Sequence, residues 1–424
     1  MNLSFLITLI SVLYILQNVV ESKKSKKKMQ RRSPSITIIK QPHNNKGGKK
    51  PKPKSTTKRK TTSKKTTTSK PSHKPRSYQS PYYIKQKLIK YYLDKKLEAK
   101  FDTSIAIQTI YINDLTCLKI KQEKTYSKKV DIDIASCSES WVKLSTKKGK
   151  PTKVCLKKDE TENNMNFYFG YALGLVPEIT RYDSNLYVTV FKNNILPTEY
   201  KQFYEVQKYS SQIIANSSFD YYSKMLSSQS FKRNKNDKRT YRFETNLREY
   251  YEKTVNISGL FSHNDLKRLS YLYCDKECKK LRCKNYGYPK KNCKECACPM
   301  PFTGTKCEKI NLKEKGCGKK QEFIANSSIS SYKIKVSTTP CYYLIKSKNK
   351  KKVKFTVEKL SRSGKLNCAP LAGLTVKYRE DRGAQGLNLC GNYKNISFPP
   401  LTSEIYLIVA DNAIDELRFS IQEK

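Results

Sequence analysis

The run of residues 166–183 holds the side chains whose types and spacing come closest to forming a catalytic site. Phe167 and Tyr171 are four positions apart, so on a helix their side chains share one face. Metal-binding histidine pairs use the same spacing. Here both positions carry aromatic rings, and a phenylalanine ring has no metal-binding atom. The run ends in Arg181 and Asp183, which we expect to hold a turn by charge-assisted hydrogen bonds.

From residue 172 to residue 183 the sequence resembles, almost letter for letter, the continuation of the zinc-binding motif of the astacin family. In that family three histidines bind zinc, and a glutamate beside the first takes a proton from zinc-bound water. Further along, residues 219–227 resemble the methionine-containing turn of the family. The family positions that this chain retains are Gly174, Glu178, Arg181, Asp183 and Met225.

The zinc chemistry implied by the resemblance is replaced at every position. The three histidine positions are Phe167, Tyr171 and Pro177, the glutamate position is Tyr168, and the tyrosine near zinc is Ser227. The chain has three histidines, and His43, His73 and His263 all lie outside both motif stretches. A neutral tyrosine is a poor ligand, so we expect no zinc, no other cofactor and no catalytic residue.

Two interpretations of the substituted rings remain open. The rings of Phe167 and Tyr171 either fill the volume left by the metal, near Met225, or line an apolar cleft that holds a peptide without cutting it. In the family, the residue at Glu178 meets the mature N-terminus, and an acidic residue of the pro-segment caps the zinc. No acidic residue occurs between Glu21 and Asp94 here, so that cap is absent.

The resemblance extends over about residues 86–274 and implies an α+β astacin-like (metzincin) domain, which we place at residues 81–274. Residues 89–93 resemble its entry strand, and residues 262–274 resemble its closing helix. The implied disulfides are Cys117–Cys274 and Cys137–Cys155. The chain has no G-x-S-x-G sequence, and its 14 cysteines fit complete pairing, so other nucleophilic chemistry finds no support.

Six cysteines fall within residues 275–308, a stretch too short to hold a core without disulfides. Their spacing, with a Cys-x-Cys step, resembles an EGF-like module and implies Cys278–Cys293, Cys283–Cys296 and Cys298–Cys307. The pair Cys293-x2-Cys296 could also suggest zinc. We expect the disulfide-rich module.

Residues 317–424 contain short alternating apolar runs at the spacing of an all-β sandwich. The expected strands are residues 332–336, 353–357, 374–378 and 405–409. With four cysteines the segment resembles a CUB domain, which implies Cys317–Cys341 and Cys368–Cys390. A cluster of acidic calcium ligands is not recognisable. The lysine-rich run 346–354 is either a solvated hairpin tip or a concentrated basic patch.

The beginning of the chain predicts secretion. Residues 1–22 resemble a signal peptide, and no later stretch is apolar enough to span a membrane. Residues 23–80 carry 21 basic residues and no acidic one, a composition that predicts disorder. Four glycosylation sequons predict surface positions at Asn216, Asn256, Asn326 and Asn395.

The net charge is +49, and about +29 of it remains on residues 81–424 when the preceding segments are set aside. We therefore expect partners among extracellular proteins or acidic glycans, with nucleic acid disfavoured by secretion. The preferred hypothesis is a secreted, catalytically inactive metalloendopeptidase homologue that acts by binding. The alternatives are an active zinc metalloendopeptidase, and a heparin-binding or acidic-glycan-binding adhesion protein.

Overall fold

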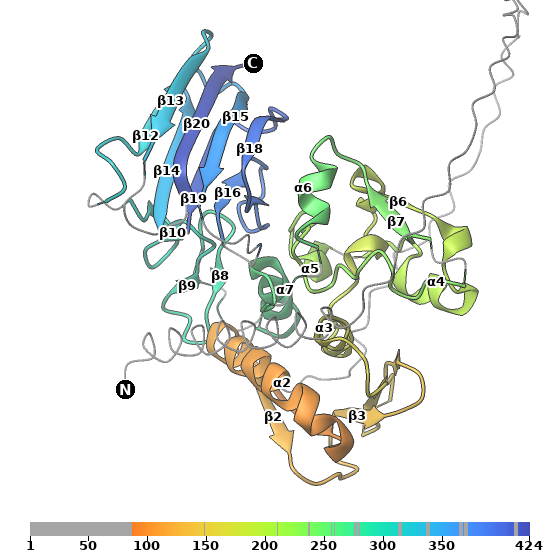
Figure 1. Ribbon diagram of the computed structural model, residues 1–424. Coiled ribbons are helices and arrows are strands. Elements are labelled where there is room, and N and C mark those ends of the chain that lie inside the picture. The colour runs from red at the N-terminus through yellow and green to blue at the C-terminus, as the bar shows by residue number, and fades with distance from the viewer. Residues whose placement is uncertain are drawn as a thin grey trace, which may run out of the picture. The chain divides into compact units, whose positions relative to one another are not determined.

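The computed structural model describes most of the chain from residue 87 onward (Figure 1). The described ranges are 87–147, 149–209, 211–235, 238–255, 257, 259–274, 278, 280–312, 316–335, 340–363, 368, 372–410 and 414–424. The expected signal peptide, the basic segment 23–80 and the sequon at Asn256 lie outside these ranges.

The first domain begins with a five-stranded sheet in the order β2-β1-β3-β5-β4. Its strands are β1 (Leu88–Leu93), β2 (Lys119–Glu123), β3 (Ile132–Ser136), β4 (Trp141–Lys143) and β5 (Thr152–Leu156). All neighbours are parallel except β4, which runs antiparallel to β5 at the sheet edge. The expected entry strand is β1, whose alternate residues Ile89, Tyr91 and Leu93 are buried.

Two helices pack with this sheet. Helix α2 (Lys95–Leu115) begins at Asp94, whose carboxylate accepts the backbone N–H of Lys96. Its buried side chains recur at helical spacing and include Leu97, Phe101, Ile105 and Ile112. Helix α3 (Glu162–Ala172) contacts both α2 and strand β5, and it carries the positions singled out in the sequence.

The second half of the domain is built from short elements around α3. They are η1 (Glu178–Thr180), η2 (Ser184–Leu186), β6 (Val188–Val190), η3 (Lys192–Asn194), α4 (Pro197–Phe203), α5 (Ser211–Ile214), β7 (Tyr241–Phe243), α6 (Arg248–Glu252) and α7 (His263–Cys274). Strands β6 and β7 form an antiparallel pair. The expected closing helix is α7.

A small module follows, with four two-residue strands. These are β8 (Tyr288–Pro289), β9 (Cys296–Ala297), β10 (Phe302–Thr303) and β11 (Lys309–Ile310). Strand β8 pairs with β9 and β10 pairs with β11. This small amount of regular structure is consistent with a module that is held together by its three disulfides.

The last domain is an all-β sandwich (Figure 1). One sheet has the order β12-β14-β19-β16-β17, and the other has the order β13-β20-β15-β18. The strands of the first are β12 (Glu322–Ala325), β14 (Cys341–Ser347), β16 (Leu374–Lys377), β17 (Leu387–Leu389) and β19 (Glu404–Val409). The strands of the second are β13 (Ser330–Ile334), β15 (Val353–Arg362), β18 (Tyr393–Phe398) and β20 (Ile414–Glu423).

The four strands expected in the sandwich occur as β13, β15, β16 and β19, although β13 begins two residues earlier than expected. Five strands of the sandwich were not expected from the sequence, among them β14, which pairs with β12 and β19. Lys346 and Ser347 were expected in a loop, whereas they end β14. Lys346 and Ser347 adopt a strand conformation because they pair with neighbouring strands, and local composition does not reveal that pairing.

The structure contains seven disulfides, and their pairing is the one that the resemblances imply. They are Cys117–Cys274, Cys137–Cys155, Cys278–Cys293, Cys283–Cys296, Cys298–Cys307, Cys317–Cys341 and Cys368–Cys390. No cysteine of the described ranges is free. Within the described part of the chain, no helix combines the length and the apolar character that crossing a membrane requires.

Candidate functional site

Helix α3 brings three consecutive aromatic residues into the interior of the first domain. Its first turn is capped by Thr161, whose hydroxyl accepts the backbone N–H of Asn164. Phe167, Tyr168 and Phe169 are each 1% exposed. Three successive buried residues cover most of the circumference of a helix, so α3 is surrounded by protein rather than lying at an open surface.

Five rings meet at the positions where the sequence resemblance places a metal. This aromatic cluster consists of Phe167, Tyr168, Tyr171, Phe203 and Phe231. The ring of Phe167 lies 4.9 Å from that of Phe231 and 5.6 Å from that of Phe203. Tyr171 lies 5.6 Å from Phe203, and Phe203 lies 5.3 Å from Phe231. These centroid distances and tilted geometries are those of stabilising aromatic pairs.

Phe203 and Phe231 were not expected at the site from the sequence. Phe203 ends helix α4, and Phe231 lies in the turn that follows residues 219–227. Neither residue belongs to a recognisable sequence motif, and both reach the cluster only because the chain folds back over α3. Met225 was expected near Phe167 and Tyr171. Its sulfur instead lies beside Gly170, between the two halves of the motif.

The two tyrosines of the cluster carry neutral phenols. The hydroxyl of Tyr168 donates to the carbonyl of Ser140 at 3.3 Å, and burial raises the pKa of Tyr168 far above its ordinary value. Burial also raises the pKa of Tyr171. A tyrosine binds a metal as a phenolate, so these environments oppose ligation as well as acid–base exchange near neutral pH.

Helix α4 also covers the edge strand β4. The side-chain amide of Gln202 donates to the carbonyl of Val142 at 3.1 Å. The ammonium group of Lys232 donates to the carbonyl of Ser140 at 2.5 Å and lies 3.4 Å from Glu199. An uncovered edge strand can accept an extended peptide through such carbonyl groups. Here side chains of the same domain occupy them, which favours the interpretation of the rings as filling over that of a peptide-holding cleft.

The donor set at the family's ligand positions does not fit zinc. Phe167 has no donor atom, Pro177 has no side-chain donor, and Tyr171 is a half-buried neutral phenol. Ser227 is buried, and its backbone carbonyl accepts the hydroxyl of Tyr241 at 2.6 Å. Zinc sites in proteins use thiolate, imidazole and carboxylate ligands. Among the described residues, no three His, Cys, Asp or Glu side chains are grouped so as to hold a metal.

His263, at the start of α7, takes no part in the aromatic cluster. Its Nε2 lies 3.0 Å from the carbonyl of Tyr286, and its ring contacts Tyr288. Burial lowers the pKa of His263 to about 3, so the imidazole is neutral at physiological pH. This histidine packs the small module against α7.

The turn after α3 is retained. Gly174 has φ +93°, a conformation that glycine adopts without strain. The backbone N–H of Leu175 donates to Gly170 at 3.0 Å and that of Gly174 donates to Tyr171 at 2.9 Å, which closes the helix. A side chain at Gly170 would meet the sulfur of Met225, so the helix and the 219–227 segment are in close contact there. The carbonyl of Met225 accepts the N–H of Glu178 at 2.9 Å.

Four charged residues beyond this turn form a buried ion network, made of Glu178, Arg181, Asp183 and Arg268. The carboxylate of Glu178 is bonded to Arg268 and lies 3.6 Å from Nε of Arg181. Arg181 binds Asp183 through two parallel hydrogen bonds of 2.8 and 2.9 Å. Glu178 and Arg268 are fully buried. Opposite charges joined by two parallel hydrogen bonds stabilise a turn.

Arg268 of α7 was not identified from the sequence. In the resemblance, Glu178 is the residue that meets a chain N-terminus. Here a guanidinium group from the closing helix is bonded to that carboxylate. Arg268 also donates to the hydroxyl of Ser217 at 2.9 Å, which ties α7 to the segment before Met225.

Asp220 lies next to this network and is fully buried. Burial and the neighbouring carboxylates of Asp265 and Glu178 raise the pKa of Asp220 to about 7. One of its oxygens accepts the backbone N–H groups of Tyr222 at 3.1 Å and Gln385 at 3.3 Å. Gln385 belongs to the sandwich, so the site region contacts the last domain.

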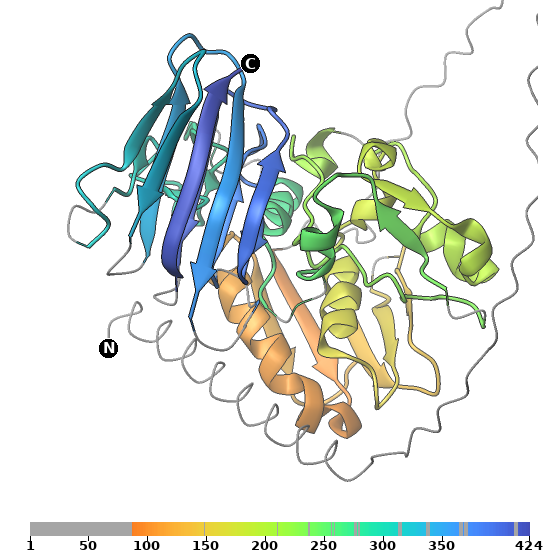
Figure 2. The same ribbon diagram turned by 45° about the horizontal axis from the view of Figure 1, so that its top comes forward.

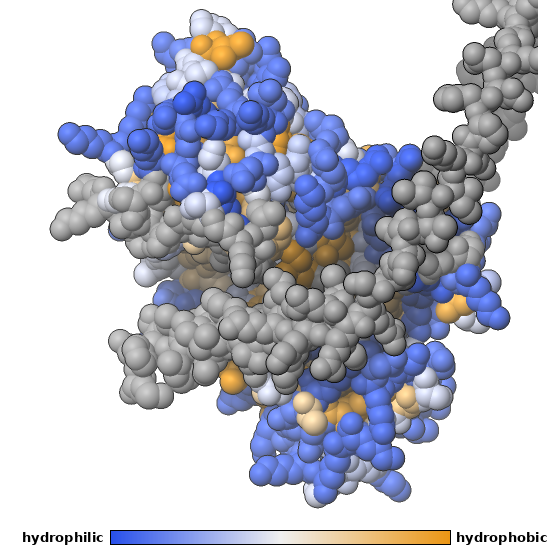
Figure 3. Space-filling model, viewed as in Figure 1, coloured by the Kyte–Doolittle hydropathy of each residue, from blue (hydrophilic) through white to orange (hydrophobic). Residues whose placement is uncertain are grey.

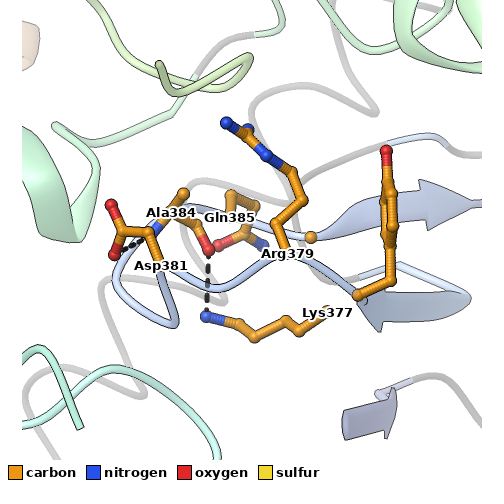
Figure 4. Close-up of a pocket in the computed structure, with 7 residues that line it drawn as sticks. Lys377, Arg379, Asp381, Ala384 and Gln385 are labelled. Atoms are coloured by element: carbon orange, nitrogen blue, oxygen red, sulfur yellow. Dashed lines mark hydrogen bonds between the residues drawn. The ribbon is translucent and has the colours of Figure 1, made fainter. Parts of the chain in front are cut away.

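The loop between β16 and β17 makes this contact with buried polar groups. Asp381 accepts the N–H of Ser218 at 2.7 Å, and Arg379 donates to the carbonyl of Phe219 at 2.7 Å. Figure 4 shows the hollow inside the loop, where the ammonium group of Lys377 points to the carbonyl of Ala384. The loop's own side chains fill the hollow, so we assign it no ligand.

Three of the expected glycosylation sites are described, and all three asparagines are exposed: Asn216, Asn326 and Asn395. Whether they carry glycans stays a prediction.

Comparison with known proteins adds a family match to this geometry. The model of the peptidase family described as Astacin matches residues 77–274. Zinc metalloproteinase nas-34 of Caenorhabditis elegans is 30% identical over 254 residues, which are 59% of this chain and 40% of that protein. Zinc metalloproteinase nas-36 of Brugia malayi is 32% identical over 146 residues, 33% of this chain and 24% of that protein. The chain thus spans less than half the length of these two relatives.

Two solved structures are similar in part. The hatching enzyme zinc-protease HCE-1 of Oryzias latipes is 19% identical, with a TM-score of 0.36 over 44% of this chain and 88% of that one. The CUB1-EGF-CUB2 domain of human MASP-1/3 is 18% identical, with a TM-score of 0.20 over 35% of this chain and 57% of that one.

Proposed function

We propose that the chain is a secreted homologue of zinc metalloendopeptidases that does not cleave peptides and acts by binding. The match of residues 77–274 to the astacin family model and the similarity to zinc metalloproteinases support the homology. The observation that carries the proposal is the replacement of all four chemical positions by Phe167, Tyr168, Tyr171 and Pro177.

The family chemistry needs a metal that activates water and a base that accepts its proton. Tyr168, at the position of the base, is buried and donates its only proton to the carbonyl of Ser140. The rings of Phe203 and Phe231 occupy the space beside it. A substrate carbonyl would have to displace packed side chains to approach α3 at this point.

The proposed role in binding depends on what surrounds the packed site. The chain carries a disulfide-rich module and a β-sandwich after the family domain, and module combinations of this kind are typical of extracellular proteins. Seven disulfides fit an oxidising compartment. The net charge of +49 favours acidic partners. We therefore propose extracellular proteins or acidic glycans as partners.

A peptidase assay tests the proposal. The purified chain is incubated with a denatured protein substrate and with a quenched peptide library, beside an active astacin-type enzyme as positive control. We expect no cleavage above buffer, with or without added zinc. Cleavage that a zinc chelator abolishes and zinc restores would overturn the proposal in favour of an active metalloendopeptidase.

A further inference from the structure

The outward face of the sheet β13-β20-β15-β18 carries a row of four cationic side chains. The strand register places Lys333 opposite Arg418, Arg418 opposite Lys359, and Lys359 opposite Lys394. Each of the four strands therefore contributes one cationic side chain. Neighbouring strands lie about 4.8 Å apart, so this basic row crosses roughly 14 Å of the sheet.

All four bases of the row face solvent. Lys333 and Arg418 are about half exposed, Lys359 is 41% exposed, and Lys394 is exposed. Like charges directly opposite one another destabilise a sheet. This arrangement therefore costs free energy that an exposed polar face with mixed charges would avoid.

A single carboxylate offsets part of this repulsion. Glu416 lies 2.9 Å from Lys333, 2.9 Å from Lys359 and 2.5 Å from Arg418. These bases hold the pKa of Glu416 well below its usual range. Four cations against one carboxylate leave the basic row with an excess of three positive charges.

The next row along the same strands consists of hydroxyl groups. The register aligns Ser331 with Ser420, Ser420 with Thr356, and Thr356 with Ser397. The hydroxyls of Ser420, Thr356 and Ser397 can each donate a hydrogen bond to an anionic oxygen. The second carboxylate near these rows is Glu358, which accepts the hydroxyl of Ser331 at 2.7 Å.

The positive surface continues beyond the hydroxyl row. Lys354 is exposed and pairs with Gln422, and the turn 348–352 between β14 and β15 contains four exposed lysines. Glu423 fixes this turn by accepting Ser347 Oγ at 2.7 Å and Asn349 N at 2.7 Å. The lysines therefore project from an ordered hairpin, which reduces the conformational entropy lost on binding.

The two outward faces of the sandwich differ in what covers them. The small module covers part of the other sheet, where the ring of Phe302 lies 5.0 Å from that of Tyr406. In Figure 2 the long strands β15 and β20 lie toward the viewer, and no described helix or strand lies in front of them. The described surface of the sandwich in Figure 3 is mainly hydrophilic.

We propose that this basic face, from the row of Lys333, Arg418, Lys359 and Lys394 to the turn 348–352, binds a sulfated glycosaminoglycan. Charge complementarity and the adjoining hydroxyl donors fit a chain that carries many sulfate groups. The described residues of both rows are polar, whereas a face that enters a lipid bilayer is rich in apolar side chains. Ile329, directly before β13, is an exposed apolar neighbour of the rows. The inference names a partner for the binding role proposed above, and it does not depend on the loss of zinc.

Lysine footprinting on the full chain tests the location directly. Acetylation rates are measured by mass spectrometry with and without heparin at about physiological salt. We expect heparin to slow acetylation of Lys333, Lys354 and Lys394 by about fivefold or more. The exposed lysines Lys119, Lys143 and Lys201 of the first domain are the internal control and should change less than about twofold. Equal protection of both sets, or protection confined to residues 23–80, would overturn the proposal.

A matched pair of variants tests the affinity. The triple variant Lys333→Gln, Arg418→Gln, Lys394→Gln keeps Lys359 beside Glu416, and it leaves Ser397, which completes the Asn395 sequon, unchanged. We expect about tenfold weaker heparin binding at physiological salt and a shallower salt dependence. The control variant Lys119→Gln, Lys143→Gln, Lys201→Gln removes the same charge and should bind within about twofold of the parent chain.

Two further outcomes are informative. Phosphatidylserine vesicles should bind the parent chain and the triple variant equally, because both keep the 21 basic residues of 23–80. Vesicle binding that the triple variant loses would assign the face to a membrane instead. The unfolding temperature of both variants should match that of the parent, since all substituted side chains lie at the surface. Because the peptidase assay has a separate readout, failure here is distinguishable from failure of the proposed loss of catalysis.

Discussion

The aromatic cluster and the buried ion network are built around the two halves of one sequence motif, and the two halves differ in which side chains they retain. Phe167 and Glu178 are 11 positions apart. On the α3 side, rings occupy the positions of the metal chemistry. On the turn side, charged residues remain and bind each other in the interior.

The physical difference between the halves explains the contrast. An emptied metal site can be filled with packed apolar groups without leaving any buried charge unpaired. Removing one member of the ion network would leave its partners charged and buried, which costs several kcal/mol. We infer that the first half could change its chemistry while the second half had to be kept to maintain the fold.

The largest expected effect comes from opening the aromatic cluster. Phe167→Ala removes a fully buried ring that contacts Phe203 and Phe231. We expect the free energy of unfolding to fall by about 3–5 kcal/mol. Urea unfolding followed by tryptophan fluorescence measures the change. Leu186→Ala is the matched control, because that side chain is 66% exposed, and it should change stability by less than about 0.5 kcal/mol. A change at Phe167 no larger than the control would contradict a packed cluster.

Breaking the ion network should cost slightly less. Glu178→Gln keeps the shape of the side chain but leaves Arg268 and Arg181 without their shared carboxylate. We expect a loss of about 3 kcal/mol, measured by the same unfolding experiment. If the variant were as stable as the parent, the turn would not depend on the network, and the comparison between the two halves would fail.

Asp220, which lies next to the network, should also give stability a pH dependence. The pKa of Asp220 is raised to about 7 in the folded chain, against an ordinary value of 3.8. Between these values the folded state binds a proton that the unfolded state has lost, so stability from this group is present at low pH and is lost as pH rises toward 7.

Asp220→Asn removes that titration. We expect the stability of the variant relative to the parent to increase by about 1 kcal/mol per pH unit between about pH 5 and 6. His263, with its pKa lowered to about 3, has the opposite dependence but is common to both proteins and cancels in the difference. A difference that stays constant between about pH 4 and 7 would show that Asp220 titrates normally.

The smallest expected effect is at the position of the family's catalytic base. Tyr168→Phe removes the hydroxyl that donates to Ser140, whose carbonyl keeps the ammonium group of Lys232. We expect a loss of about 0.5–1 kcal/mol, again measured by urea unfolding. A loss as large as that of Phe167→Ala would mean that the hydroxyl, rather than the packing of the ring, stabilises the cluster.

Much of the fold could be predicted from the sequence because the motifs are local or cysteine-based. The astacin-family resemblance is confirmed by the family match over residues 77–274, and the expected order of an α+β domain, a disulfide-rich module and an all-β sandwich is confirmed. The family resemblances also implied the seven disulfide pairs that the structure contains.

The residues that contact the motif from other parts of the chain could not be predicted. Phe203, Phe231 and Arg268 are far from α3 in sequence, and nothing in their local pattern marks them as neighbours of the motif. The basic row could not be predicted for the same reason. Lys333, Lys359, Lys394 and Arg418 belong to four separate strands, and only the strand register aligns them.

Zinc-linked stability tests the central claim most directly. A ligand that binds the folded state raises the free energy of unfolding by about 2.7 kcal/mol at 100 times its dissociation constant. The experiment measures urea unfolding of the full chain in a zinc-selective chelator and again in excess zinc. If the aromatic cluster has replaced the metal, the two unfolding curves will coincide. A shift of the zinc curve to higher urea, with one zinc bound per folded chain, would contradict the account.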